Sequence, residues 1–333
     1  MSCIILILSL ILLQLKFESF FKRAELIQLS SDVIIGSISN IVITEEGNYI
    51  ISDPLGNAIL IFSRNGKFLK KIGGAGSGPG EYRSPNCLSL DAWGNIYVED
   101  RGNRRVNIYN KDGEFKNSFK LQKSPVVSLK VDESGKVYTY CPGGVGRDEM
   151  VIYVYDNKGE LVNKFGQLPK FMWDFPFVIA GGGMIMDSKG FIYQVHPVEY
   201  VVNKYSRDGT IVKKFKINSS FYKAPYKPDL KTIQMEYQKW LDSWTPVSGL
   251  YLLNDSYIVT LLSLGKDKMG MKKLVMDILN LDGEIIKSGI ELLTPQNLSI
   301  IGAYKDGLFF LEQLPQDEKG NIPNPRIIKY VIK

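Results

Sequence analysis

The chain has 333 residues, of which 41 are Lys or Arg and 35 are Asp or Glu, so its formal net charge is +6. A charge this small, with the lysines dispersed along the chain, does not by itself indicate a nucleic-acid or membrane surface. The three cysteines and the single histidine form no C-x-x-C or H-E-x-x-H pattern, so the sequence predicts no zinc site and no other cofactor.

The first segment is an apolar run over residues 3–13. It is shorter than the roughly 18 to 20 residues that span a membrane, and its length is typical of the apolar part of a secretory signal. Basic residues follow the run rather than precede it, and no A-x-A site comes after it, so an uncleaved anchor stays open. We therefore expect residues 1–24 to be a signal peptide or an N-terminal membrane anchor. The protein would then be periplasmic, on the cell surface or secreted.

Six times along the chain, a short apolar strand runs into a polar turn and then into a second apolar strand. These turns are EEGN at 45–48, AWGN at 92–95, ESGK at 133–136, SKGF at 188–191, NDSY at 254–257 and KDGL at 305–308. A later series of turns places Gly66, Gly113, Gly159, Gly209 and Gly283 between two further strands, and the first four of these glycines lie 46 to 50 residues apart. This spacing is typical of four-stranded propeller blades.

The repeat predicts an all-β fold: a six-bladed β-propeller over residues 25–333, with four antiparallel strands, A to D, in each blade. The sixth blade begins at LSIIGAY and ends at RIIKYVIK without a fourth strand, whereas ELIQLS at 25–30 is a strand with no blade of its own. We expect this N-terminal strand to complete the last blade, because closure removes the open sheet edges. The first five blades are expected at 38–74, 87–121, 128–167, 182–217 and 249–291.

An insertion at 223–246, between blades 4 and 5, breaks the strand pattern. Within it, residues 228–244 have apolar positions at helical spacing, with a proline at the start and another after the end. The segment connects strand D to strand A, so it should lie on the face that carries the B–C and D–A loops. We expect Leu230, Ile233 and Leu241 to pack on the blades, and Tyr237 and Trp244 to be partly exposed toward the mouth of the channel.

Residues 73–119 contain GSGPGEY, a proline, DAWGNIYVED, NRRV and a D-G turn. This arrangement closely resembles the NHL repeat, and the whole chain resembles the bacterial exported six-bladed propellers of that superfamily. The resemblance implies the fold rather than a reaction. It also implies that Asp100, Asn103 and Arg105 tie the B–C loop together. Cys87 and Cys141 are expected in strands of neighbouring blades, as buried thiols or as a disulfide.

In every blade, the residue six positions after the equivalent point of the A–B turn lies at the end of strand B. Equivalent positions in a closed propeller form a ring around the channel mouth. Their residue types differ from blade to blade, as those of a binding surface do, although drift would look the same. The ring consists of Asp53, Asp100, Cys141, His196, Leu261 and Gln313.

Three functions stay open. The favoured one is a non-catalytic module that binds a peptide, glycan or protein on the B–C/D–A face. The alternative is a hydrolase or lyase that uses His196 with Asp100 or Asp53, because histidine is the usual acid or base at neutral pH. A Ca²⁺ ion would need two or more inward carboxylates plus carbonyl oxygens, and Asp53 and Asp100 could supply only part of that set. The third is RNA binding through Arg101, Arg104 and Arg105. The candidate binding residues are Asp53, Asp100, Arg101, Arg104, Tyr140, Arg147, His196, Gln313, Tyr237 and Trp244.

Overall fold

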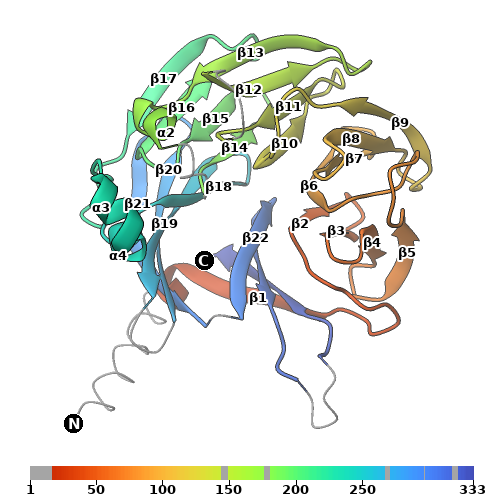
Figure 1. Ribbon diagram of the computed structural model, residues 1–333. Coiled ribbons are helices and arrows are strands. Elements are labelled where there is room, and N and C mark those ends of the chain that lie inside the picture. Colours follow the sequence, from red (N-terminus) through yellow and green to blue (C-terminus); the bar gives the residue numbers. More distant parts are fainter. Residues whose placement is uncertain (1–16, 144–148, 176–180, 267–270, 296, 317–321) are drawn as a thin grey trace.

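The computed structural model describes residues 17–333 apart from 144–148, 176–180, 267–270, 296 and 317–321. Six four-stranded antiparallel sheets stand in a ring around a central channel, as the sequence repeat predicts (Figure 1). In each blade the innermost strand, A, lines the channel and the outermost strand, D, faces outward. The prediction of a six-bladed propeller is therefore confirmed.

The strands follow the chain from the inside of each blade to the outside. Blades 1 to 3 consist of β2 (Asn40–Ile43), β3 (Tyr49–Asp53), β4 (Ala58–Phe62) and β5 (Phe68–Ile72); β6 (Pro85–Leu90), β7 (Ile96–Asp100), β8 (Arg105–Tyr109) and β9 (Phe115–Lys120); and β10 (Ser128–Val131), β11 (Val137–Tyr140), β12 (Met150–Tyr155) and β13 (Leu161–Gln167).

Blades 4 and 5 consist of β14 (Gly183–Met186), β15 (Ile192–Val195), β16 (Val201–Tyr205) and β17 (Ile211–Lys216); and β18 (Val247–Leu253), β19 (Tyr257–Lys266), β20 (Lys272–Asn280) and β21 (Ile285–Thr294). Blade 6 combines the two ends of the chain: β22 (Leu298–Tyr304), β23 (Gly307–Glu312), β24 (Arg326–Ile332) and β1 (Phe21–Gln28).

The N-terminal strand closes the ring, as expected. β1 pairs antiparallel with β24, from Phe21 opposite Ile332 to Gln28 opposite Arg326. It begins at Phe21, before the expected start at residue 25, so residues 21–24 belong to blade 6 rather than only to a leader. Phe17 is also buried, and its ring stacks on that of Phe21 with 4.8 Å between centroids. These two aromatic side chains explain the earlier start, because they fill the core between blades 5 and 6.

The glycines of the C–D turns fix how neighbouring blades contact each other. All five have positive φ, and a Cβ at Gly159 would lie 2.2 Å from the Cβ of Phe119, in the outermost strand of the preceding blade. Gly209 and Gly283 face Phe165 and Phe215 in the same way. At Gly66 the facing residues are Ile27 and Gln28 of β1. The N-terminal strand therefore makes the same contact with blade 1 that each outermost strand makes with the next blade.

The insertion contains two short helices where the sequence predicts one. They are α3 (Leu230–Met235) and α4 (Tyr237–Leu241), separated at Glu236, whose φ of −130° and ψ of 24° are not helical. Asp229 caps α3 by accepting a hydrogen bond from the Thr232 N–H at 2.7 Å. A third helix, α2 (Lys170–Asp174), was not expected and lies in the connection between blades 3 and 4. In the described part of the chain, none of the helices has the length and hydrophobicity needed to cross a membrane.

Candidate functional site

The Asp53 carboxylate is buried at the end of β3 and serves its own loops. Its oxygens accept hydrogen bonds from the backbone N–H groups of Gly36, Ser37 and Gly56 at 2.8 to 2.9 Å. A carboxylate surrounded by backbone donors is a strong structural acceptor. Asp53 therefore joins the D–A connection to the B–C loop of blade 1.

Asp100 has the equivalent role in blade 2. It is fully buried and accepts from the Arg83 N–H at 2.8 Å, from Asn103 at 2.6 Å and from Arg105 Nε at 3.0 Å. The Arg105 guanidinium also donates to the carbonyl oxygens of Ser77, Gly78 and Glu81. The tie between Asp100, Asn103 and Arg105 that the NHL resemblance implies is present. Neither charge is left for a ligand.

His196, in blade 4, is 2% exposed. Its Nδ1 lies 3.2 Å from the hydroxyl of Tyr140, which is also fully buried and lies 3.2 Å from the Val195 carbonyl oxygen. Burial lowers the pKa of His196 to about 3, so the imidazole is neutral at physiological pH. In the described part of the chain, no hydrogen bond or ion pair joins His196 to Asp53 or Asp100. The structure does not bring the expected catalytic group together.

The other candidate residues divide between core and surface. Cys141 and Leu261 are buried, whereas Gln313 is exposed and pairs with Asn297 through two hydrogen bonds of 2.7 and 2.8 Å. Trp244 is 5% exposed, which corrects the expectation that it would be partly exposed. Tyr237 is 36% exposed, as expected.

The arginines proposed for RNA binding do not act together. Arg105 is bound to Asp100, whereas Arg104 is exposed and Arg101 lies 3.9 Å from the carboxylate of Glu99. Arg147 lies outside the described residues, as do the side chains of Leu230 and Ile233.

Sequence reasoning gave Glu99 only the role of neutralising the nearby arginines, but this residue, which precedes Asp100, is fully buried. Its two oxygens accept from the Val126 N–H and from the Asn86 side chain, both at 2.9 Å, so it links blade 2 to the segment that enters blade 3. Cys87 and Cys141 are free thiols that share one core cluster, and burial raises the pKa of Cys141 to about 12. This chemistry makes them inert packing residues.

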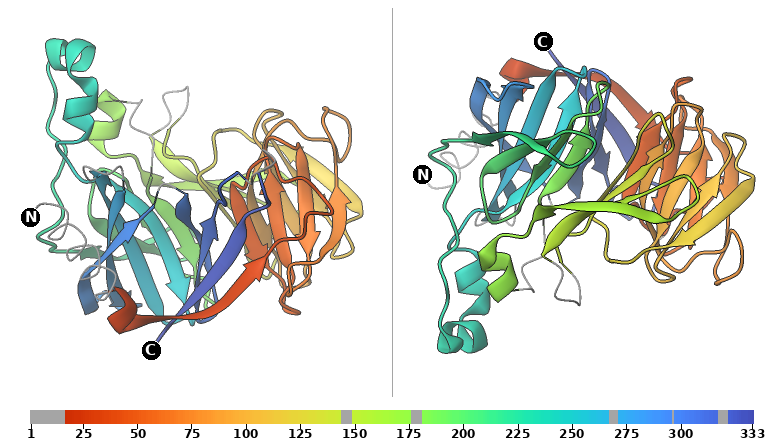
Figure 2. Two further views of the ribbon diagram at one scale, coloured as in Figure 1. Left: turned by 90° about the horizontal axis from the view of Figure 1, so that it is seen from below. Right: turned by 90° about the horizontal axis from the view of Figure 1, so that it is seen from above.

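The most prominent feature of the B–C/D–A face is a projection, which we call the helical tower: α2 together with α3 and α4 (Figure 2). Trp240 is 1% exposed at its centre. Its ring centroid lies 6.3 Å from those of Phe171 and Phe175 and 6.1 Å from that of Trp244. Two connections that are distant in sequence therefore form one packed unit. Val198, two residues after His196, packs in the same cluster and places the tower on the expected face.

A cleft of about 630 Å³ lies at the foot of the tower, between the loops of blade 4 and the start of the insertion. Its walls are held in place, because the Tyr222 hydroxyl donates to the Val198 carbonyl at 2.7 Å and the Thr245 N–H donates to the Lys223 carbonyl at 2.9 Å. Apolar side chains and a few polar groups line it. They include Phe171, Val198, Tyr222, Pro225, Glu199 and Lys216.

The cleft is chemically suited to bind an apolar group beside a polar one. Desolvation raises the pKa of Glu199, and the charge of Lys214 partly offsets this effect. Apolar concave sites with a small number of polar groups are the usual form of a ligand site. The sequence signal that could have located the cleft is the aromatic segment KFMWDF at 170–175, which forms α2 and the residue that follows it.

No group of three or more His, Cys, Asp or Glu side chains is placed to hold a metal ion among the residues that the structure describes. The carboxylates of Asp53 and Asp100 are engaged with their own loops, in separate blades. The structure thus assembles neither a metal centre nor an acid–base pair from the residues named by the sequence.

Comparison with known proteins agrees with the fold. Human NHL repeat-containing protein 3 is 30% identical over 77 residues, so the alignment covers 22% of this chain and 22% of that relative. A solved structure of a protein described as exported, from Bacteroides fragilis, covers 95% of this chain and 96% of its own with a TM-score of 0.67 and 15% identity. A streptogramin B lyase structure has a TM-score of 0.55 and 11% identity, covering 95% and 99%. At such identities the likeness shows the fold alone.

Together, the blades, the closing strand and the NHL-type ties of blade 2 define an NHL-type six-bladed propeller. Residues 11–303 match the model of a family described as a domain of unknown function, DUF4934. The chain belongs to this family.

Proposed function

We propose that the protein is a non-catalytic binding propeller that takes a peptide segment of a partner protein on its B–C/D–A face. The observation that carries the proposal is the cleft of about 630 Å³ at the foot of the helical tower. Propeller folds place binding function in loops on a rigid scaffold. Here the loops of blade 4 form the floor, and the tower forms one wall.

The composition of the cleft favours a peptide over a glycan. Phe171, Val198 and Tyr222 supply apolar wall, and Glu199 and Lys216 supply one charge of each sign. An apolar side chain with a neighbouring backbone amide or charged group matches this lining. Aromatic anchors in such pockets contribute much of the energy of protein interfaces.

The catalytic alternative has less support from the geometry. His196 is buried, neutral and paired with Tyr140, and Asp53 and Asp100 hold their own loops. The likeness to a streptogramin B lyase extends to the fold. A general acid or base must reach the proton that it transfers, and none of these three groups is exposed.

We also infer that the partner is met outside the cytoplasm. The apolar run at residues 3–13 and the likeness to a protein described as exported support this inference. Fusing residues 1–40 to alkaline phosphatase, which is active only after export, tests it in bacterial cells. An active fusion is expected, and a fusion that stays inactive while its protein accumulates would contradict it.

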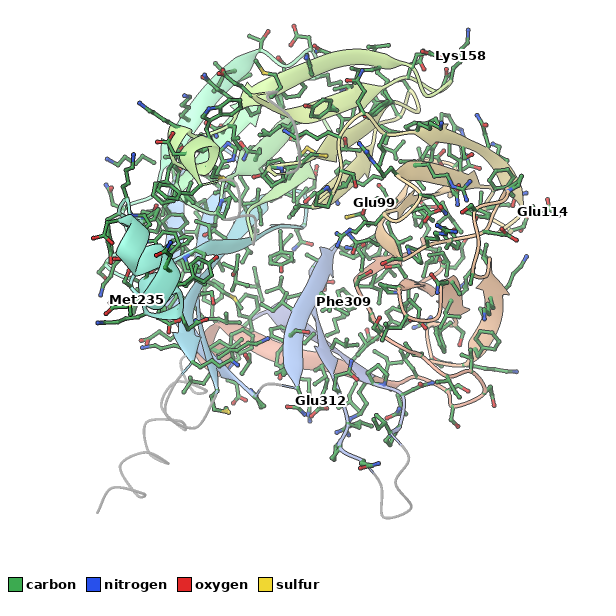
Figure 3. The ribbon with its side chains drawn as sticks, viewed as in Figure 1. Glu99, Glu114, Lys158, Met235, Phe309 and Glu312 are labelled. Carbon is green, nitrogen blue, oxygen red and sulfur yellow. The ribbon has the colours of Figure 1, made fainter. Side chains whose placement is uncertain are left out.

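The binding proposal is tested by selecting peptides from a random display library on the immobilised full chain. Ala224 lines the cleft and is exposed, so Ala224→Trp fills the site without replacing a core residue. We expect selected peptides to lose at least tenfold in affinity for this variant, measured by calorimetry. Lys158→Trp is the matched control, since Lys158 is exposed in a C–D turn, and these turns lie opposite the B–C and D–A loops. Figure 3 labels Lys158 at the outer edge of the ring.

Two results would overturn the proposal. In one, the selected peptides bind Ala224→Trp and Lys158→Trp equally well. In the other, no peptide is selected while a glycan array gives binding that Ala224→Trp removes, which would transfer the site to a different class of partner.

A further inference from the structure

The central channel is a second cavity, distinct from the cleft. It has a volume of about 1200 Å³ and is lined by the innermost strands of all six blades (Figure 3 labels Phe309 on its wall). The wall has apolar and polar parts in similar measure, and Val42, Leu90, Met186, Leu252 and Ile301 are among its apolar side chains. The cavity is therefore large enough for a small organic molecule.

Lys130 of β10 is the unusual residue of this wall. It lines the channel five positions before the turn glycine Gly135, where blades 1, 2 and 4 have Val42, Ser89 and Ile185. In the part of the chain that the structure describes, its ammonium group has no hydrogen bond and no ion pair. Burial lowers the pKa of Lys130 below its usual value.

The carboxylates that line the A–B end of the channel interact with groups other than the Lys130 ammonium. Asp132 accepts from the Ser134 hydroxyl at 2.7 Å and from the Tyr138 hydroxyl at 3.1 Å. Asp187 accepts from Tyr193 at 3.0 Å. The other two, Asp255 and Glu133, are bound to Ser188 and Arg207.

A partly buried ammonium group without a counter-charge is unfavourable, and a bound anion would remove that cost. Apolar side chains such as Leu90 and Met186 lie among the polar groups of the wall, so an anion with an apolar body can contact both kinds of group. We propose that the channel is a binding site for a small monocarboxylate with an aliphatic or aromatic body, whose carboxylate pairs with Lys130. This site is separate from the cleft and does not depend on the peptide-binding proposal.

Calorimetry on the full chain with octanoate, acetate and octan-1-ol tests the proposal. Octanoate carries both features, acetate only the charge, and octan-1-ol only the apolar body. We expect octanoate to bind more tightly than either, and Lys130→Met to weaken octanoate binding at least tenfold, equivalent to about 1.4 kcal/mol. Lys136→Met is the matched control, because Lys136 is exposed in the A–B turn of the same blade and its loss changes the net charge equally.

A thermal melt of each variant separates binding from folding. Lys130→Met should melt no lower than the parent protein, because the substitution removes an unpaired, partly buried charge, and Lys130→Arg should retain octanoate binding. Equal octanoate affinity in Lys130→Met and the parent would overturn the proposal. So would no octanoate binding at millimolar concentration, or a lowered melting temperature in Lys130→Met, which would show that the lysine has a structural role.

Discussion

Asp53 and Asp100 show how one position at the end of strand B can serve the fold rather than a ligand. Each carboxylate accepts several hydrogen bonds from the loops that meet above its blade. A buried acceptor of this kind stabilises the fold only while its donors stay in place. The residue types at the ends of the B strands differ from blade to blade. This diversity therefore reflects different ways of joining two loops as much as it reflects ligand binding.

The neutral state of His196 predicts a specific pH dependence. Its pKa is about 3 in the folded protein and about 6.5 in an unfolded chain, so the unfolded chain binds one more proton between these values. The free energy of unfolding should therefore fall as the pH falls from about 6.5 towards 3. We expect the parent protein to lose about 2 kcal/mol more than His196→Asn between pH 7 and pH 5, measured by urea unfolding.

His196 is the single histidine of the chain, so no other imidazole contributes to that difference. Parallel pH dependence in the two proteins would contradict the neutral buried state. An imidazole NMR signal that titrates near pH 6.5 would do the same.

The C–D turn glycines predict a second effect at single positions. Gly159 has φ of +86°, and a Cβ there would overlap Phe119 at 2.2 Å. Gly159→Ala should therefore lose about 2 kcal/mol or more of stability, since both the left-handed backbone and the overpacking oppose it. Gly74→Ala is the control, because nothing lies within 4 Å of its added Cβ. Equal melting temperatures for the two variants would contradict the close contact between blades 2 and 3.

At the scale of elements, Trp240 determines whether the tower is a rigid unit. It belongs to α4, is fully buried against Phe171 of α2, and its Nε1 donates to the Tyr226 carbonyl oxygen at 3.0 Å. Trp240→Ala should lower the free energy of unfolding by about 3 to 5 kcal/mol, as truncations of large core residues do. Tyr237→Ala, at a residue 36% exposed, should cost much less. A tower that detaches while the propeller stays folded would instead give a separate early transition in the melt.

The strands could be predicted from sequence because their turns carry glycine at positions that require positive φ, such as Gly66 and Gly113. The tower could be predicted only in part. Apolar spacing indicated a helix at 228–244. The helix is interrupted at Glu236, where the sequence contains no helix-breaking Gly or Pro. α2 has five residues and no side-chain cap, so its local signal is weak, and its stability comes from packing against Trp240. The cleft depends on two distant connections and could not be read from either alone.

At the scale of the whole molecule, closure depends on one pair of strands. β1 covers β24 and also packs Ile27 and Gln28 against Gly66 of blade 1. A chain that starts at Phe17 keeps all these contacts, whereas a chain that starts at Leu29 loses them and leaves β24 as an open edge. We expect a sharp loss of melting temperature and solubility only for the shorter chain. Equal melting temperatures would show that β1 is dispensable for the ring.

Phe21→Ala provides an independent measurement, because it keeps the hydrogen bonds of β1 and removes only its buried ring. It should cost about 3 to 5 kcal/mol. A loss of unfolding free energy well below 1 kcal/mol would show that the hydrogen bonds of β1, and not its buried ring, stabilise the closed propeller.

The junction of β1 and β24 also sets the order of events when the protein folds. The Gln28 side chain donates to the carbonyl oxygen of Asn324, 296 positions along the chain. Closing a loop of this length costs about 3 to 4 kcal/mol more conformational entropy than closing a five-residue hairpin. Blades 1 to 5 can each form from local hairpins, whereas blade 6 must wait for both ends. We therefore expect this junction to form last and to open first, so that proteases would gain access there and the lifetime of the folded ring would depend on how rarely the junction opens.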